Sequence, residues 1–418
     1  MRVLALSTSY PKGPNDSTAP FVRSISHGLA RHGLDVHLLI PKHPDLTWAS
    51  GDPPANLYTY PYAPRSWRRL HVWGFAGALV ADTSLRPTAL AVSPVAAISA
   101  VAHLARLAKR LRPDVLHAHW LLPNGPLVAL VSQRTGIPLA ISLHGSGVFL
   151  AERHTMLARA ARYALRRAVQ VTACSGDLAR RAERLSASAL ATTVIPYGVE
   201  ATAFTPASAA ERERAKVALG LSASSFVILA VGRLVAKKGF EFLIRAIPPL
   251  ADGTPKPALV IAGSGDLEHE LRQLASECGV GDCTRFLGDV DRERITRLFH
   301  AADVLAVPSI HDAAGNVDGL PNVVLEGLAS GLPLVASRVA GIPEVIQHER
   351  NGLLVPEQNW KAISAALRRL AVDDELRRSL ANAARQTAQD TLDWRLITAR
   401  YADTLTKATS GVRKRTHE

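Results

Sequence analysis

Short apolar runs alternate with longer amphipathic segments along the whole chain. Apolar runs of this length are typical of strands buried in a parallel sheet, and segments with a period near 3.6 are typical of helices that cover such a sheet. In the first half, strands are predicted at residues 3–7, 36–40, 115–117, 139–143 and 169–173, and helices at 22–31, 97–111 and 158–168. Gly33 and Gly136 follow predicted helices, where a glycine commonly ends a helix.

The second half repeats this alternation. Strands are predicted at residues 226–231, 258–262, 284–287, 304–307 and 334–337, and helices at 240–247, 267–275, 292–300 and 322–330. Strand-helix alternation in both halves predicts an α/β protein with two Rossmann-like, doubly wound domains. A length of 418 residues also exceeds what one ordinary core supports.

The predicted domain boundary lies in the loop that follows Ile195 and Pro196. We therefore expect an N-terminal domain at 1–196 and a C-terminal domain at 197–391. A further helix at 392–412 is expected to return to the N-terminal domain.

Three cysteines, Cys174, Cys278 and Cys283, form neither a paired framework nor a zinc-binding spacing, which favours a reduced, cytoplasmic setting. The N-terminal apolar run at 3–7 is too short for a signal peptide. The longest uncharged apolar stretch, 87–104, carries Pro94 and His103 and runs into a basic segment, so we predict that it does not span a membrane.

Charge is distributed unevenly between the two halves. Residues 1–200 hold 22 Lys and Arg against 10 Asp and Glu, whereas residues 201–418 hold 27 against 26. An excess of positive charge on one domain raises the local concentration of anionic partners. Nucleic acid, anionic lipid and lipid pyrophosphate are all partners of this kind. No nucleic-acid-binding module accompanies the charge, so an anionic membrane surface is favoured over nucleic acid. The basic residues lie at 106–112, 159–167 and in the aromatic segment 66–73, although each of these stretches is also typical of a solvated surface.

Two segments of the second half carry the candidate chemistry. Arg233 and Lys238 lie five residues apart between a predicted strand and a helix, where a planar guanidinium and an ammonium can converge on one diphosphate. Two basic residues in a loop are also typical of plain surface. Asp318 and Glu326 flank a Gly-Pro turn and the start of a helix, whose backbone amides and dipole favour phosphate or sugar oxygens. The alternative is that Asp318 caps the helix and Glu326 is an ordinary helical residue.

Together these segments resemble the family-4 glycosyltransferases, retaining enzymes of the GT-B architecture, in which two such domains face each other. The resemblance implies that Arg233 and Lys238 bind the donor diphosphate and take part in catalysis. It implies that Glu326 binds the ribose hydroxyls and that Asp318, where the family usually has Glu, binds the hexose hydroxyls. It further implies that the hexose and its phosphate face the backbone of Gly319, Leu320, Pro321, Asn322 and Val323.

Further matches extend the resemblance to the nucleotide pocket. Gly263 and Gly265 resemble the glycine loop that lines it, and Asp289 and Val290 resemble the loop that contacts the base. Asp289 and Asp291 also read as a metal-binding DxD pair, but Asp291 is placed to cap a helix. We expect catalysis without a metal or other cofactor, because Arg233, Lys238 and the helix amides supply the charge.

Parts of the first half resemble the acceptor side of the family. His144 begins a segment similar to the family's HGSD loop and is expected to lie beside the transferred sugar, although Gly147 replaces the usual Asp. Ala19 stands where the family commonly has Gly. His117 and His119 lie on one face of a strand and suggest either a metal pair or, as we favour, a structural or substrate-lining role.

The sequence thus predicts a retaining glycosyltransferase that moves a hexose from a UDP- or GDP-sugar to a glycan or glycolipid acceptor. It is expected in the cytoplasm, peripherally on the inner face of the cell membrane. A nucleotide-sugar 2-epimerase and a non-catalytic sugar-nucleotide-binding protein are the alternatives.

Overall fold

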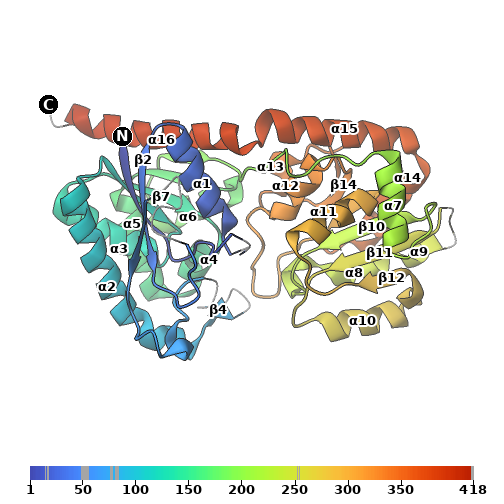
Figure 1. Ribbon diagram of the computed structural model, residues 1–418, viewed down its shortest axis with the longest axis horizontal. Coiled ribbons are helices and arrows are strands. Elements are labelled where there is room, and N and C mark those ends of the chain that lie inside the picture. Colours follow the sequence, from blue (N-terminus) through green and yellow to red (C-terminus); the bar gives the residue numbers. More distant parts are fainter. Residues whose placement is uncertain are drawn as a thin grey trace. The chain divides into compact units, whose positions relative to one another are not determined.

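The computed structural model describes residues 1–14, 16, 18–48, 56–75, 79–80, 84–251, 253 and 255–415. The chain divides into two compact units, Met1–Pro196 with Trp394–Glu418, and Tyr197–Asp393. We call them unit 1 and unit 2. Each is a parallel α/β layer structure, so the predicted fold class is confirmed for both (Figure 1).

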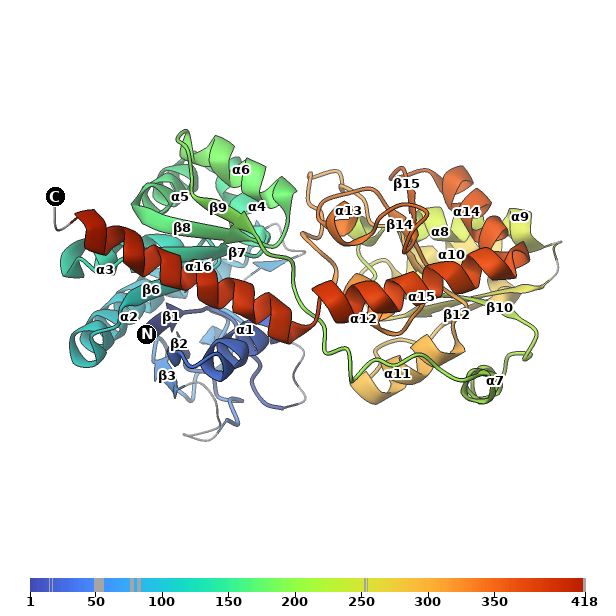
Figure 2. The ribbon, with the colours of Figure 1, turned by 90° about the horizontal axis from the view of Figure 1, so that it is seen from above.

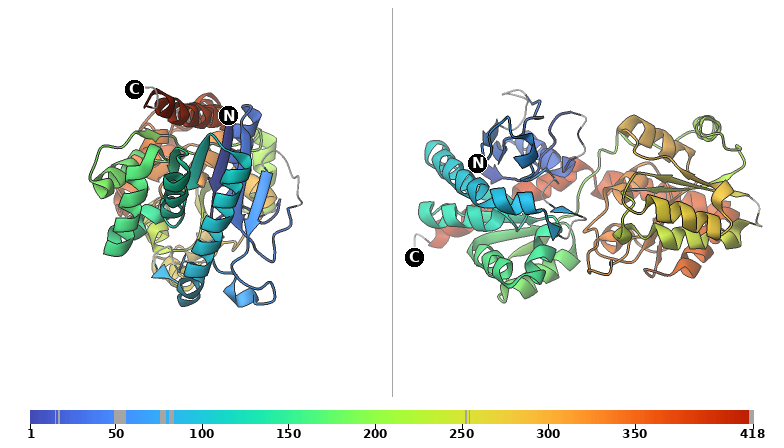
Figure 3. Two further views of the ribbon diagram at one scale, coloured as in Figure 1. Left: turned by 90° about the vertical axis from the view of Figure 1, so that its left-hand side faces the viewer. Right: turned by 90° about the horizontal axis from the view of Figure 1, so that it is seen from below.

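Unit 1 contains a seven-stranded parallel sheet in the order β3-β2-β1-β6-β7-β8-β9. Helices α1 and α16 lie on one face of this sheet, and α2 and α3 lie on the other (Figures 2 and 3). Its elements are β1 Arg2–Leu6, α1 Pro20–Arg31, β2 Asp35–Pro41, β3 Asn56–Tyr60, η1 Arg68–Leu70, β4 Leu79–Val80, β5 Ser84–Leu85, α2 Pro87–Leu111, β6 Val115–His119, α3 Asn124–Thr135, β7 Leu139–Leu143, α4 Ser146–Arg153, α5 Thr155–Arg167, β8 Ala168–Ala173, α6 Gly176–Ser186, β9 Thr192–Val194 and α16 Trp394–Arg415.

Unit 2 contains a six-stranded parallel sheet in the order β12-β11-β10-β13-β14-β15. Helices α8, α10 and α14 bury apolar side chains in one continuous core with the strands. Its elements are α7 Ala209–Ala218, β10 Phe226–Val231, η2 Ala236–Lys238, α8 Phe240–Ala246, α9 Pro248–Ala251, β11 Pro257–Ala262, α10 Glu268–Glu277, η3 Gly281–Cys283, β12 Thr284–Phe286, α11 Arg292–Ala301, β13 Val304–Val307, α12 Asn322–Ala329, β14 Leu334–Ser337, α13 Ile342–Val345, β15 Leu353–Val355, α14 Trp360–Val372 and α15 Asp374–Thr391.

Helix α16 packs on unit 1, as predicted for the returning C-terminal helix. Ile397, Tyr401 and Leu405 are fully or almost fully buried, in one cluster with Val3 and Ile25 of the N-terminal strand and helix. The last helix of the chain therefore completes the core of the first unit (Figure 2).

Helix α2 begins at Pro87, ten residues before the predicted start, because Pro94 lies inside it instead of before it. Pro94 cannot donate to the carbonyl of Leu90, and the Ser93 hydroxyl donates to that carbonyl instead, at 2.8 Å. The helix is long and apolar enough to cross a membrane by length and composition, with 28% of its most apolar window buried. Its small side chains, among them Ala96 and Ala100, are buried against the rest of unit 1, while Leu90, Val95 and Ile98 are exposed.

Candidate functional site

The candidate residues of unit 2 gather at the carboxyl edge of its sheet. Arg233 and Lys238 follow β10, and the segment from Asp318 to Val323 follows β13. Strands β10 and β13 are neighbours, and the strand order reverses between them. Open α/β sheets bind their ligands in the crevice at such a switch point. The predicted diphosphate and sugar residues thus lie on loops that leave the sheet side by side.

A buried ionic cluster links these two loops. Asp318 Oδ2 lies 2.6 Å from Lys238 Nζ, and Asp318 Oδ1 lies 2.7 Å from Lys237 Nζ. Burial by itself would raise the pKa of Asp318, but Lys238 and then Lys237 hold it well below its ordinary value of 3.8. One carboxylate thus fixes two ammonium groups, and the three side chains together keep a positive charge.

Lys237 was not among the predicted site residues. Its side chain is only 11% exposed, whereas a lysine next to a predicted phosphate-binding lysine reads as plain surface. The sequence carries no signal for this role, because the contact of Lys237 with Asp318 depends on how the loops after β10 and β13 meet in space. The alternative that Asp318 caps α12 is wrong, since the cap position is Pro321 and no side chain caps this helix.

The glycines after β10 and β11 hold the two loops in backbone contact. A β-carbon on Gly263 would lie 2.1 Å from the carbonyl oxygen of Gly232, and one on Gly265 would lie 2.5 Å from that of Leu234. Leu234 N donates to Ser264 O across the same contact, at 2.8 Å. Gly263 and Gly265 therefore bring the loop that carries Arg233 against its neighbour, and only glycine fits there.

The loop after β12 joins the same edge. Gly263 N donates to Gly288 O at 2.8 Å, and the Ser264 hydroxyl donates to Asp289 Oδ1 at 2.6 Å. Asp291 accepts a hydrogen bond from Arg294 N and caps α11, as predicted. Asp289 and Asp291 thus have separate partners, and the adjacent Val290 is half-buried.

The start of α12 completes the edge. Leu320, Pro321 and Val323 are buried, whereas Asn322 is exposed and the backbone N–H groups of the first turn have no side-chain cap. Gly319 O accepts from Gly341 N at 2.8 Å, which ties the turn to the loop after β14. Glu326 is half-buried one turn into the helix, and Arg233 is exposed on its loop.

In unit 1, His144 sits in a cage of rings at the end of β7. Its ring centroid lies 4.7 Å from that of Phe21 and 5.0 Å from that of Trp120, and its Nε2 lies 3.1 Å from His119 Nδ1. Burial and then the proximity of His117 lower the pKa of His144 to about 3. The imidazole is therefore neutral near pH 7 and has one N–H to donate.

His117 and His119 support His144 from within the sheet. Both are almost fully buried, and His117 Nε2 lies 2.7 Å from the Ser142 hydroxyl. Burial lowers the pKa of His117 to about 4, so this ring is neutral as well. The His117 ring also contacts the His119 ring, which bonds His144, so the observed contacts are those of a supporting network.

Two family models match the two halves of the chain: "Glycosyl transferase 4-like domain" over residues 18–198 and "Glycosyl transferases group 1" over residues 211–387. D-inositol 3-phosphate glycosyltransferase of Saccharomonospora viridis is 32% identical over 321 residues, which are 72% of this chain and 71% of that protein. The chain belongs to the family-4, or group 1, glycosyltransferases.

Other relatives match over a shorter stretch. The GDP-mannose-dependent alpha-(1-6)-phosphatidylinositol monomannoside mannosyltransferase of Mycobacterium tuberculosis is 33% identical over 213 residues, 50% of this chain and 54% of that protein. The chain thus spans about half the length of the first curated relatives it matches. Among solved structures, Anabaena HepE in complex with UDP-glucose aligns with a TM-score of 0.71 and 20% identity, over 97% of this chain and all of that one. This likeness shows the GT-B fold.

The departure from the family at Gly147 has a packing cause. A β-carbon at Gly147 would lie 2.7 Å from Leu122 N and 2.8 Å from Leu122 O, so no side chain fits between α4 and the segment after β6. The usual Asp of the glycosyltransferase loop is absent because the backbone of another segment occupies its space.

We therefore expect Gly147→Asp to destabilise unit 1 by about 1–3 kcal/mol instead of restoring a family contact. The matched control is Ser146→Asp, one residue earlier at the start of α4, where an acidic side chain is favourable and the expected change is within about 0.5 kcal/mol. Thermal unfolding of both variants measures this. An unchanged midpoint for Gly147→Asp would show that the loop has room for the carboxylate.

Two non-glycine residues on the segments that supply the rings around His144 adopt the left-handed conformation. Ala19 has φ 48°, and Trp120 has φ 67°. They lie on the loops after β1 and β6, the neighbouring strands at which the strand order of unit 1 reverses. Ala19 thus takes the conformation for which the family commonly uses Gly, and strain of this kind is concentrated at functional loops.

The predicted aromatic anchor at 66–73 is only partly an exposed surface. Trp67 is 60% exposed, whereas Trp73 is 7% exposed and donates to the Tyr60 hydroxyl at 3.1 Å. Two of the basic residues, Arg162 and Arg167, bond carbonyl oxygens within unit 1. The prediction was wrong for Trp73, because its indole N–H finds a partner in the core.

Proposed function

We propose that this protein is a retaining glycosyltransferase that transfers a hexose or related sugar from a nucleotide diphosphate sugar to a glycan or glycolipid acceptor. The observation that carries the proposal is the edge of unit 2, where the loops after β10, β11, β12 and β13 meet the uncapped start of α12. It gathers cationic side chains and backbone amides at a strand switch point, which is the environment that a diphosphate needs.

In this proposal Arg233 and Lys238 bind the diphosphate, with α12 amides aimed at the phosphate that joins the sugar. As the glycosidic bond breaks, negative charge grows on the leaving diphosphate, and these groups stabilise it more than they stabilise the ground state. No metal or other cofactor is proposed for this step. Asp318 holds Lys238 in place and keeps oxygen lone pairs for a hexose hydroxyl, while Glu326 accepts from the ribose.

Retention of configuration requires the acceptor oxygen to approach the face from which the diphosphate leaves. The leaving phosphate then accepts the proton of the acceptor hydroxyl, so no nucleophilic carboxylate is needed. His144, neutral in its ring cage, donates its hydrogen bond to the transferred sugar in this scheme. Its positioning by His119 fixes where that N–H points.

The donor is best tested by a screen of UDP, GDP and ADP and their sugars. We favour a UDP-sugar, since the structurally similar HepE was solved with UDP-glucose, and a GDP-sugar is the second choice, since a relative is GDP-mannose-dependent. One nucleotide class should raise the thermal midpoint of the protein and be consumed only in the presence of an acceptor. Consumption without an acceptor, yielding an epimer, would contradict the transferase and favour an epimerase. Binding with no turnover across an acceptor panel would favour a non-catalytic protein.

We further propose that unit 1 docks on the inner face of the cytoplasmic membrane through an apolar and basic surface. Leu90 and Ile98 of α2 are 53% and 72% exposed, and Trp67 lies on the neighbouring segment. Apolar anchors with flanking Arg are typical of an interfacial segment. Co-sedimentation with anionic but not neutral vesicles is expected, and it should fall in Ile98→Ser but not in Val217→Ser, an exposed valine of unit 2. Equal recovery with both lipids would contradict this proposal.

A further inference from the structure

Unit 1 contains a cavity of about 380 Å³ that none of the roles above uses. It lies where β2 and β3 end, at the carboxyl edge of the sheet, and Lys42 N donates to Tyr60 O between the two strand ends at 2.9 Å. The residues that line it are Lys42, His43, Pro44, Leu46, Thr59, Pro61, Ala63, Arg65 and His71. This volume is within the range of small-molecule sites.

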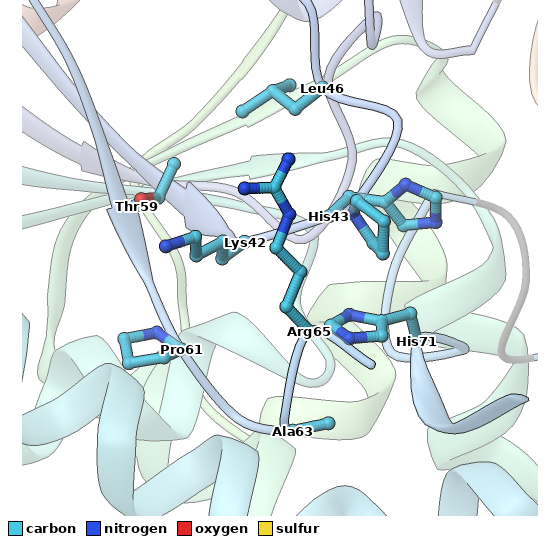
Figure 4. Close-up of a pocket in the computed structure, with 9 residues that line it drawn as sticks. Lys42, His43, Leu46, Thr59, Pro61, Ala63, Arg65 and His71 are labelled. Carbon is cyan, nitrogen blue, oxygen red and sulfur yellow. The ribbon is translucent and has the colours of Figure 1, made fainter. Parts of the chain in front are cut away.

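The lining is strongly cationic. Figure 4 shows the Arg65 side chain extending into the cavity between Lys42 and His43. Across the described part of the chain, no carboxylate forms an ion pair with Lys42 or Arg65. The nearby Asp45 pairs with Arg68 at the rim instead. Two cationic side chains therefore line one space, and neither is paired with a carboxylate of the described residues.

The two histidines add directed hydrogen-bonding groups. His43 Nδ1 accepts from Asp45 N at 3.2 Å, so a neutral His43 carries its proton on Nε2. His71 Nε2 donates to Pro64 O at 3.1 Å, and its buried Nδ1 has no partner among the described residues. Burial, then the charge of Lys12 and also of His71 and Arg68, lowers the pKa of His43 in spite of Asp45. The positive field that disfavours protonation of His43 would be relieved by an anion.

The wall of the cavity is connected through packed side chains to the residues around His144. The ring of Phe75 lies 5.1 Å from that of His43, and Phe75 N donates to Thr8 O at 3.0 Å. Phe75 and Tyr10 are buried in one cluster, against which Leu46, Phe21 and Trp120 pack. Phe21 and Trp120 are the rings that hold His144, so the cavity and His144 border the same apolar cluster.

We infer that this cavity binds a phosphate group of the acceptor, an inference that rests on the proposed transferase function. A phosphate has the charge and the several acceptor oxygens that Lys42, Arg65 and the His43 N–H can satisfy together. The phosphate belongs either to a soluble sugar phosphate or to a lipid headgroup. The rim carries exposed Arg68 and lies next to α2, whose Ser99 hydroxyl donates to Pro61 O of the lining.

The test is a histidine NMR titration of the full chain with inorganic phosphate at low ionic strength, with UDP present to fill the donor site. The Cε1–H signals of His43 and His71, assigned from His43→Gln and His71→Gln, should both shift when phosphate binds, and the pKa of His43 should rise. The double variant Lys42→Ala/Arg65→Ala should weaken phosphate binding by about tenfold or more. Arg69→Ala, an exposed arginine of η1 outside the lining, is the matched control and should bind as the wild type does.

Phosphate that shifts neither histidine, or that binds the double variant and the wild type equally, would overturn the inference. Because Lys42 and Arg65 are exposed side chains, the double variant should stay folded, which an unchanged UDP-induced thermal shift would show. If the wild type binds phosphate in this cavity but binds no nucleotide, the proposed function is refuted and the anion site stands. If it binds a nucleotide but no phosphate here, only the anion site is refuted.

Two further arms identify the source of the phosphate. Glycerol 3-phosphate represents a soluble acceptor, and vesicles with phosphatidic acid, compared with pure phosphatidylcholine, represent a lipid. A histidine shift with either probe supports an acceptor phosphate and names its source. Shifts with inorganic phosphate alone would contradict the acceptor role.

Discussion

Replacing Lys238 with alanine is expected to slow sugar transfer by about a hundred- to a thousandfold, the loss seen when one preorganised donor to a developing oxyanion is removed. The Lys238 ammonium is fixed by Asp318 at 2.6 Å and lies against the Gly232 backbone, where the donor loop leaves β10. Because it is already oriented, it stabilises the departing diphosphate without reorganising. Steady-state kinetics with the donor found in the nucleotide screen measure the loss. Arg233→Ala should also slow sugar transfer.

The matched control is Lys361→Ala, which removes a lysine of unit 2 that lies on α14 beside the Trp360 ring, away from the sheet edge. It should keep wild-type turnover. Wild-type turnover of Lys238→Ala, measured on folded protein, would remove Lys238 from the catalytic site.

Asp318→Asn is expected to destabilise unit 2 by about 3 kcal/mol near pH 7, because it leaves two buried ammonium groups without their common counter-charge. Lys237 and Lys238 are only 11% and 15% exposed, so neither can recover full hydration without moving its loop. Urea unfolding measures the change. Glu349→Gln is the control, since Glu349 pairs with Arg369 at the exposed surface, and this variant should unfold at nearly the same urea concentration as the wild type.

The contact of Asp318 with Lys238 and Lys237 also predicts how the stability of unit 2 changes with pH. The folded pKa of Asp318 lies below its ordinary value of 3.8, so its ionisation stabilises the fold above that pH, and this stabilisation is lost as the pH falls toward the folded pKa. The difference in unfolding free energy between wild type and Asp318→Asn should be constant above about pH 5 and shrink below about pH 4. A difference that does not depend on pH would show that the carboxylate charge is not what stabilises unit 2.

Local pattern was enough to predict most of the architecture. The central strands of both sheets are apolar runs bounded by turn residues, and their alternation with helices leaves few topologies open. Short strands such as β3, β9 and β15 were missed, because runs of three to five residues carry little periodic signal, and β3 and β9 also mix polar with apolar residues. The start of α2 was missed because a proline inside a helix resembles a helix boundary.

The site was predictable only as far as its residues lie in motifs. Arg233, Lys238 and Asp318 stand in recognisable segments, but that Lys237 shares Asp318 depends on how two loops meet in space. The ring cage brings Phe21 and the adjacent His119 and Trp120 to His144 from two segments that are distant in the sequence, and no local pattern links them. Likewise, Gly147 reads as a lost polar residue in the sequence, and only the backbone of Leu122 shows why it must be small.

The central claim is that the carboxyl edge of unit 2 binds the diphosphate of a sugar nucleotide. A crystal structure of the protein with UDP, or with the nucleotide that the screen selects, tests it most directly. We predict diphosphate oxygens within hydrogen-bond distance of Arg233, Lys238 and the first backbone amides of α12, with the ribose at Glu326. A nucleotide bound elsewhere, with these groups turned away from it, would contradict the account.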